Sequence, residues 1–258
     1  MPGFESLSVG VVIWLICVIA LAGAVQGALG LGFPIVATPL IAAVTDMRTA
    51  VIVVLLPCLA SIATNIVKSG SLRPVLAEFW TMPIYMILGA AVGTRVFIAF
   101  PQFPYTLLLA GMIFFYLNLE RLGRTDWPLL RTHRGFFGMV FGVLAGAAEG
   151  TANIAAPPLV IYYLALGVTP ATLVQGLNIC FFAGKTTQFA TLATAGGVEV
   201  VQWLATLPLA VVSCVMSVFG IRIRNRIDAA TYRTWLKRAL FVMALLLLAQ
   251  YAYLSTVA

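Results

Sequence analysis

An apolar segment broken by glycine and proline occurs twice in this sequence. Residues 22–40 read AGAVQGALGLGFPIVATPL, and residues 145–163 read AGAAEGTANIAAPPLVIYY. The separation is 123 residues (145 − 22), and it pairs Gly23 with Gly146, Gln26 with Glu149, Gly27 with Gly150, and Pro34 with Pro157. Hydrophobic segments interrupted at corresponding positions of two repeats are typical of transporters and point to the binding site.

A second match follows in the same order. Gly93-Thr94-Arg95 with Tyr105 corresponds to Gly220-Ile221-Arg222 with Tyr232, at a separation of 127 (220 − 93). The four extra residues fit an insertion in an intervening loop. We therefore predict an N-terminal transmembrane repeat and a C-terminal one, joined by a polar cytoplasmic linker; their residues are 1–119, 135–258 and 120–134, respectively.

The composition places both repeats in lipid. The chain is 62% hydrophobic and 9% charged, whereas a soluble domain carries about 25% charged residues. Too few charges are present to cover a surface that faces water. The net charge of +7 comes mostly from short loops between apolar runs, a pattern that orients membrane proteins. The bilayer is thus the expected partner, and nucleic acid is not.

Each half contains five hydrophobic segments, some too short to span a bilayer. An odd number makes the second half enter the membrane upside down. We therefore predict an all-α integral membrane protein of two inverted-topology repeats. The interrupted pairs are either two spans or re-entrant hairpins, which leaves eight to ten segments. The segments are 9–27, 29–44, 49–67, 79–100 and 105–119 in the first half, and 135–150, 152–166, 170–192, 200–220 and about 235–258 in the second.

Charge supports this topology. Basic residues gather in 68–73, 121–134 and 222–238, which the positive-inside rule assigns to the cytoplasm. The turns at 101–104 and 193–199 contain no Lys or Arg and then lie outside. We expect a multi-pass protein of the plasma (cell inner) membrane with both termini on the non-cytoplasmic side.

No pattern for covalent chemistry is evident. The four cysteines stand singly in apolar runs, and His133, the only histidine, lies in a charged loop. Neither arrangement has metal-ligand spacing or suits a catalytic triad. We therefore predict no cofactor, no metal and no enzymatic activity.

The helix breaks are candidate anion sites. A helix broken at mid-membrane exposes backbone amides and the positive end of its dipole. Irregular backbone at that depth must line a cavity or be buried in protein. Gly30, Gly32 and Gly150 stand where the breaks are expected, and Thr151 and Asn153 add donors in the second copy only. The remaining glycines of the GxxxG type predict close helix packing.

Two charged residues lie inside apolar runs. Glu149 and Lys185 would each cost about 2.5–3.5 kcal/mol at the bilayer centre. They either pair with each other or divide the work, with Lys185 attracting an anion and Glu149 carrying a coupling proton. Asn178 lies two helical turns before Lys185, and Gln175 adjoins that face. These amides either line the pathway or bond neighbouring helices.

The two glycine–proline segments resemble those of the sulfite exporter TauE/SafE family. GALGLGFPIVATPL is similar to its first motif, GTANIAAPPLVIYY to its second, and Asn65 stands where the family often has asparagine. The second motif usually reads Gly-Ile-Gly-Gly, whereas residues 153–156 read NIAA, so we expect less backbone freedom at that turn. The resemblance implies a multi-pass transporter, with members linked to export of sulfite, sulfoacetate and related anions.

We therefore expect a secondary transporter for small anions, such as sulfite or organosulfonates like sulfoacetate. It would work by alternating access between the repeats and be driven by a coupling proton or ion. A passive anion channel and a non-catalytic membrane subunit of a larger complex are the alternatives. The oligomeric state, including a homodimer, is left open.

Overall fold

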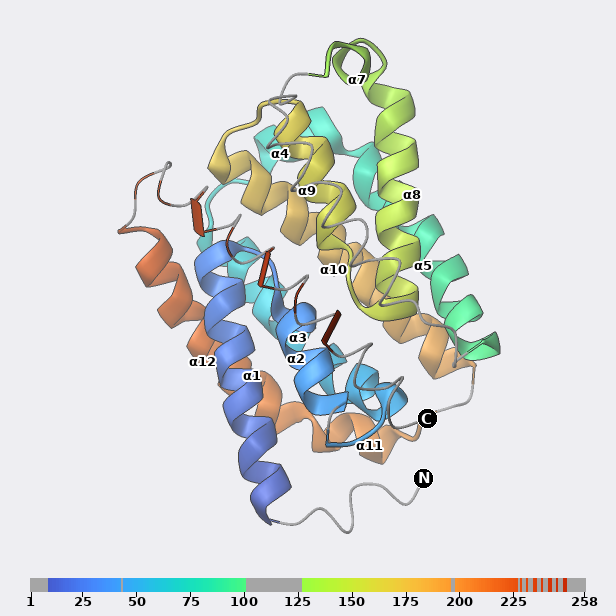
Figure 1. The fold of residues 1–258 in the computed structure, drawn as a ribbon, viewed down its shortest axis with the longest axis vertical. Helices are drawn as coiled ribbons and strands as arrows, with labels where there is room; N and C mark the ends of the chain where they lie inside the picture. Colours follow the sequence, from blue (N-terminus) through green and yellow to red (C-terminus); the bar gives the residue numbers. More distant parts are fainter. Residues whose placement is uncertain are drawn as a thin grey trace.

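The fold is described by a computed structural model and is helical throughout the part described (Figure 1). The structure describes residues 9–42, 44–100, 127–195 and 198–226, and scattered positions from 228 to 249. The helices of the first half are α1 (Val9–Leu29), α2 (Phe33–Ala42), α3 (Met47–Lys68), α4 (Arg73–Phe79) and α5 (Thr81–Ala99). Those that follow are α7 (Pro128–Thr132), α8 (Arg134–Ala152), α9 (Ala156–Ala165), α10 (Pro170–Thr194), α11 (Val200–Ala205) and α12 (Leu207–Arg224).

Within the described residues, five stretches are long and apolar enough to cross a membrane, judged by length and composition: Val9–Leu29, Arg48–Lys68, Thr81–Ala99, Arg134–Ala152 and Val200–Arg224. With 10 residues each, α2 and α9 are too short to span alone. α10 has 25 residues, but its polar side chains keep it out of that apolar group. The predicted segment 105–119 lies outside the described residues, and the predicted segment 235–258 lies mostly outside them. Both remain predictions.

A helix break is present near each predicted place, but Gly150, which was expected at the second break, lies inside α8. The first break, residues 30–32, separates α1 from α2, and the second break, residues 153–155, separates α8 from α9. Gly30 and Gly32 have φ angles of 74° and 107°, which glycine adopts without steric cost. Asn153 has a φ of 62°, in the left-handed region that asparagine tolerates better than most residues. The expected loss of backbone freedom therefore does not prevent this turn at Asn153.

Three boundaries differ from the predictions. Residues 68–78 lie between two predicted segments, but α4 begins within them, with proline in its first turn and Val75 and Phe79 buried. The predicted single span 200–220 is divided into α11 and α12 near Thr206. The short helix α7 lies within the predicted linker. In each case a proline stands in the first turn of the new helix, where its fixed φ favours helix initiation.

Glycine faces bring two helix pairs into close contact, α1 with α12 and α5 with α8. A Cβ atom on Gly27 would overlap the Ser217 carbonyl, and one on Gly150 would overlap the Thr94 amide nitrogen. Only glycine permits such a backbone approach. The prediction of close packing is confirmed for Gly27, whereas Gly150, which was predicted as a site residue, also packs against a neighbouring helix.

α3 and α10 connect the two helix pairs. α3 contacts α12, α1 and α2, whereas α10 contacts α5, α8 and α9, and the two helices also contact each other. Both are lined with buried apolar residues, including Val53, Val54, Leu173 and Leu177. Four polar residues of α10, Gln175, Asn178, Lys185 and Gln188, are thus held inside the molecule.

Candidate functional site

The two breaks meet at one small internal cavity. The first break contributes Gly32, and the second contributes Asn153 and Ala155. About 10 Å³ is open to the centre of a water molecule, which is room for roughly one water. The other lining residues come from α1, α2, α3, α8, α9 and α10: Gln26, Pro34, Ile35, Cys58, Ile62, Glu149, Ala156 and Phe181.

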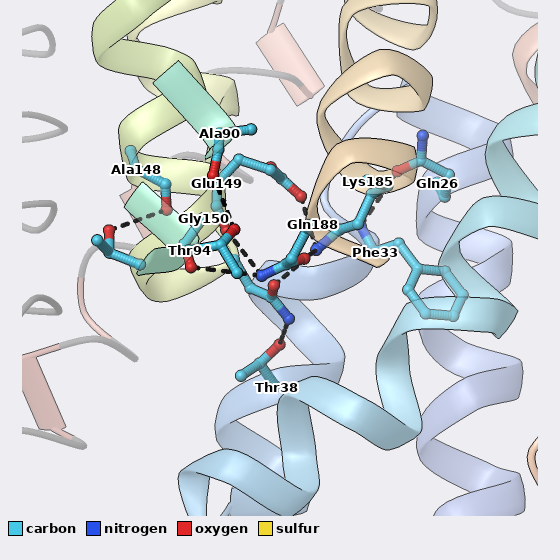
Figure 2. Close-up of polar contacts among 12 residues, drawn as sticks. Gln26, Phe33, Thr38, Ala90, Thr94, Ala148, Glu149, Gly150, Lys185 and Gln188 are labelled. Atoms are coloured by element: carbon cyan, nitrogen blue, oxygen red, sulfur yellow. Dashed lines mark hydrogen bonds and ion pairs between the residues drawn. The ribbon is translucent and has the colours of Figure 1, made fainter. Parts of the chain in front are cut away.

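Lys185 lies at the centre of the polar contacts around this cavity (Figure 2). Its Nζ is 2.6 Å from Glu149 Oε1, and both side chains are buried, with exposed fractions of 0% and 2%. The same ammonium donates hydrogen bonds to Asn153 Oδ1 at 2.6 Å and to Gln188 Oε1 at 2.9 Å. Three acceptors thus surround a group with three N–H donors. Of the two interpretations of Glu149 and Lys185, the mutual ion pair is the one observed.

The contact between the two charges is electrostatic more than directional. Among the residues that the structure describes, no donor makes a hydrogen bond of good geometry to Glu149 Oε1, although Lys185 Nζ is close. The interaction at that oxygen is thus the ion pair with Lys185.

Gln188 and Asn153 connect the ammonium to the end of α8 and to α2. Gln188 Nε2 donates to the carbonyls of Glu149 at 3.2 Å and Gly150 at 3.5 Å. Carbonyls at a helix C-terminus lack intrahelical donors, so this side chain satisfies part of the second break. Asn153 Nδ2 donates to Thr38 Oγ1 at 3.2 Å, which links the second break to the helix that follows the first.

Gln26 performs the corresponding task at the first break. Its Oε1 accepts the Phe33 N–H at 3.1 Å, and its Nε2 donates to Asn178 Oδ1 at 3.0 Å. Asn178 Nδ2 donates in turn to the Gly30 carbonyl at 3.1 Å. The first amide of α2 is therefore capped by a side chain. Residues 29–33 have no side-chain donor of their own, as expected, and Gln26 of α1 and Asn178 of α10 supply donors from outside the break.

Of the predicted site residues, Gly32, Glu149 and Asn153 line the cavity, and Lys185, Gly30 and Asn178 are bonded to residues that line it. The other three make their contacts elsewhere. Gly150 packs against α5, and its carbonyl accepts a hydrogen bond from Gln188. Thr151 Oγ1 donates to the Ala147 carbonyl at 2.8 Å within its own helix. Gln175 Nε2 donates to the Gly70 carbonyl at 3.1 Å, near the loop between α3 and α4. The structure thus brings together Gly30, Gly32, Glu149, Asn153, Asn178 and Lys185.

Several contributors were not singled out from sequence. Gln188 follows Lys185 by one helical turn and aligns with Asn65, which was a usable signal. Thr38 gave none. Arg224 donates to Asn65 Oδ1 at 3.2 Å and to Ser69 Oγ at 2.7 Å, but it stands in a basic stretch whose charges were assigned to orientation. No three His, Cys, Asp or Glu side chains gather into a metal site among the described residues.

Comparison with known proteins gives one family. The model of the family described as "Sulfite exporter TauE/SafE" matches residues 15–251, which is nearly the whole chain. No curated protein and no solved structure is significantly similar to it. Members of the matching family are membrane transporters and not enzymes, in agreement with the membrane-spanning helices and the internal polar site. The chain belongs to the sulfite exporter TauE/SafE family and is a multi-pass membrane transporter.

Proposed function

We propose that this transporter moves a small sulfur anion, such as sulfite or sulfoacetate, through a site centred on Lys185. The carrying observation is that a fully buried ammonium contacts Glu149 and Asn153, both of which line the cavity where the two broken helices meet. An ionisable group inside a membrane protein is a candidate functional site. A sulfur oxyanion offers several oxygen acceptors, which match the three N–H donors of Lys185.

Alternating access between inverted repeats is part of the proposal. α2 and α9 begin at residues 33 and 156, and α3 and α10 at 47 and 170, both separations of 123. Gly30 and Asn153 have the same separation and the same left-handed backbone. These correspondences support a duplicated unit with its breaks in equivalent places.

The helix pairs support it further. Gly27 of α1 faces Gly220 of α12, and Gly150 of α8 faces Gly93 of α5. In the repeat alignment these are the same contact with the two halves exchanged. A two-fold pseudo-symmetry would produce this pairing. Relative movement of the halves could then open the site to either side.

Charge balance connects transport to protons. The Glu149–Lys185 pair is neutral, so an anion entering this site would leave one negative charge buried without compensation. Protonation of Glu149 removes that charge and leaves Lys185 to the anion. A carboxylate next to the bound anion would thus move one proton with each substrate. The cavity is too small to admit an ion of the size of sulfite. We therefore interpret this conformation as closed, which disfavours a continuous channel.

Flux into proteoliposomes tests the function. We expect saturable uptake of sulfite or sulfoacetate that responds to an imposed pH gradient. Lys185→Ala should reduce it to the level of empty vesicles, while the protein still purifies as a single species. Unchanged uptake in this variant would exclude Lys185 from the site, and rates that do not saturate would identify a channel.

Glu149→Gln tests the coupling separately. The amide keeps the size of the side chain but cannot exchange a proton at neutral pH. We expect flux down the anion gradient to persist and its dependence on the pH gradient to disappear. A pH dependence like that of the wild type would reject the coupling role of Glu149.

A further inference from the structure

A second cavity lies where α3 and α12 end and α10 begins. Its volume is about 610 Å³, and it shares no lining residue with the cavity beside Lys185. Its lining includes Lys68, Ser69, Thr169, Val174, Arg224 and Asp228. We call it the vestibule. The charge pattern of the loops assigns this end of the molecule to the cytoplasm.

The vestibule carries an excess of positive charge. Among the described lining residues, Lys68 and Arg224 provide two cations and Asp228 provides one carboxylate. That carboxylate accepts hydrogen bonds from the amide and hydroxyl of Thr231, both at 2.8 Å. The Arg224 guanidinium is half-buried and is oriented by Asn65 and Ser69. A partly buried charge is less screened by salt than an exposed one, so Arg224 is placed to attract an anion.

One apolar contact separates the vestibule from the polar groups of the first break. Val174 lines the vestibule, and it packs so tightly on Gly30 that a Cβ there would lie 2.7 Å from Val174 Cγ1. The Val174 carbonyl accepts a hydrogen bond from Asn178 at 2.7 Å. From Val174 onward, Asn178, Phe181 and Lys185 follow at helical spacing on one face of α10. This face therefore leads from the vestibule to the buried ammonium.

We propose that the vestibule is a recruitment site for the transported anion. Lys68 and Arg224 bind the sulfonate or sulfur oxyanion while it is still partly hydrated. The anion then passes Val174 and reaches Lys185. The inference rests on the proposed function. The volume of the vestibule also accommodates an organosulfonate with its carbon chain, which the closed inner cavity does not.

The test is uptake of radiolabelled sulfoacetate by oriented proteoliposomes made of phosphatidylcholine alone, so that no anionic headgroup competes. Lys68→Gln and Arg224→Gln should each raise the KM for anion on the vestibule side by about threefold to tenfold, as for a modest charge contact. The maximal rate should stay nearly unchanged, and the effect should shrink as salt is added. Arg224→Lys should restore part of the loss.

Arg73→Gln is the matched control, because it removes the same charge from an exposed residue near the same end of α3 that does not line the vestibule. Its KM should remain that of the wild type. An equal rise in this control, or no rise in either vestibule variant, would overturn the inference. Transport that requires Lys185 but ignores Lys68 and Arg224 would reject the vestibule alone, whereas absence of any sulfur-anion transport would reject both proposals.

Discussion

A buried ammonium and a buried carboxylate are each costly alone and tolerable together. Lys185 and Glu149 have almost no exposed surface and lie 2.6 Å apart. Removing one partner of such a pair leaves an uncompensated charge and costs about 3–5 kcal/mol, whereas replacing both with apolar residues is often nearly neutral. The pair should therefore show strong thermodynamic coupling.

Lys185→Met and Glu149→Leu should each lower the stability of the detergent-purified protein, and the double variant should recover most of the loss. A double-mutant cycle of thermal or denaturant unfolding measures the coupling. Simple addition of the two losses would show that the ion pair does not stabilise the fold as inferred. The double variant should still fail to transport anions.

Asn153 combines a backbone requirement with two side-chain contacts. Asn153→Gly keeps the left-handed turn but removes the bonds to Lys185 and Thr38, whereas Asn153→Ala removes the bonds and adds strain of about 1–2 kcal/mol. We expect the alanine variant to unfold at a lower temperature than the glycine variant, with both impaired in anion uptake. Equal stability of the two variants would contradict the assigned role of the backbone.

At the scale of helices, the glycine faces determine how closely the two helix pairs approach. Gly27→Ala would push α1 from α12, and Gly150→Ala would push α8 from α5, because the added methyl group meets backbone atoms that cannot rotate away. Overpacking of this kind costs about 1–3 kcal/mol. Both variants should melt at lower temperature than the wild type.

Gly135→Ala provides the control for this comparison. It also lies in α8, but a Cβ there meets nothing within 4 Å. Because alanine is the better helix former by about 1 kcal/mol, this variant should be as stable as the wild type or slightly more stable. A similar loss in all three variants would show that the close backbone contacts of Gly27 and Gly150 are not its cause.

α10 shows what pattern reading can achieve for a single element. Its predicted range of 170–192 is close to the observed Pro170–Thr194, because Thr169 caps the first turn and proline follows it. Its partners were not predictable in the same way. Gln175 and Asn178 are three residues apart on adjoining faces, yet one bonds the loop after α3 and the other bonds the first break.

At the scale of the whole molecule, the topology is directly testable. In a background with the four native cysteines replaced by alanine, Ser71→Cys and Asn225→Cys should react with a membrane-impermeant maleimide only from the cytoplasmic side. Ala195→Cys should react only from the opposite side. All three positions are exposed, so accessibility reports orientation. Labelling of all three from one side would reject the predicted insertion.

The sequence by itself determined that the chain lies in a membrane, roughly where two helices break, and which buried residues are charged. Three features were recognisable in the sequence: the low number of charges, glycine and proline at two corresponding places, and Glu149 and Lys185 inside apolar runs. Each can be interpreted from the chemistry of the residues themselves, without knowledge of their neighbours in space. The break at 30–32 was therefore expected, and the break at 153–155 was expected slightly earlier in the chain, around Gly150. Their left-handed turns follow from the residue types Gly30 and Asn153.

Only the tertiary structure decided which groups meet. That Glu149 faces Lys185, that Gln26 caps the Phe33 amide, and that Arg224 lines a cavity are contacts between helices distant in sequence. In an almost uniformly apolar helix no amphipathic stripe marks the inner face, so periodicity does not reveal its neighbours. Helix approach through small glycine faces sets those pairings, and with them the position of the buried charge.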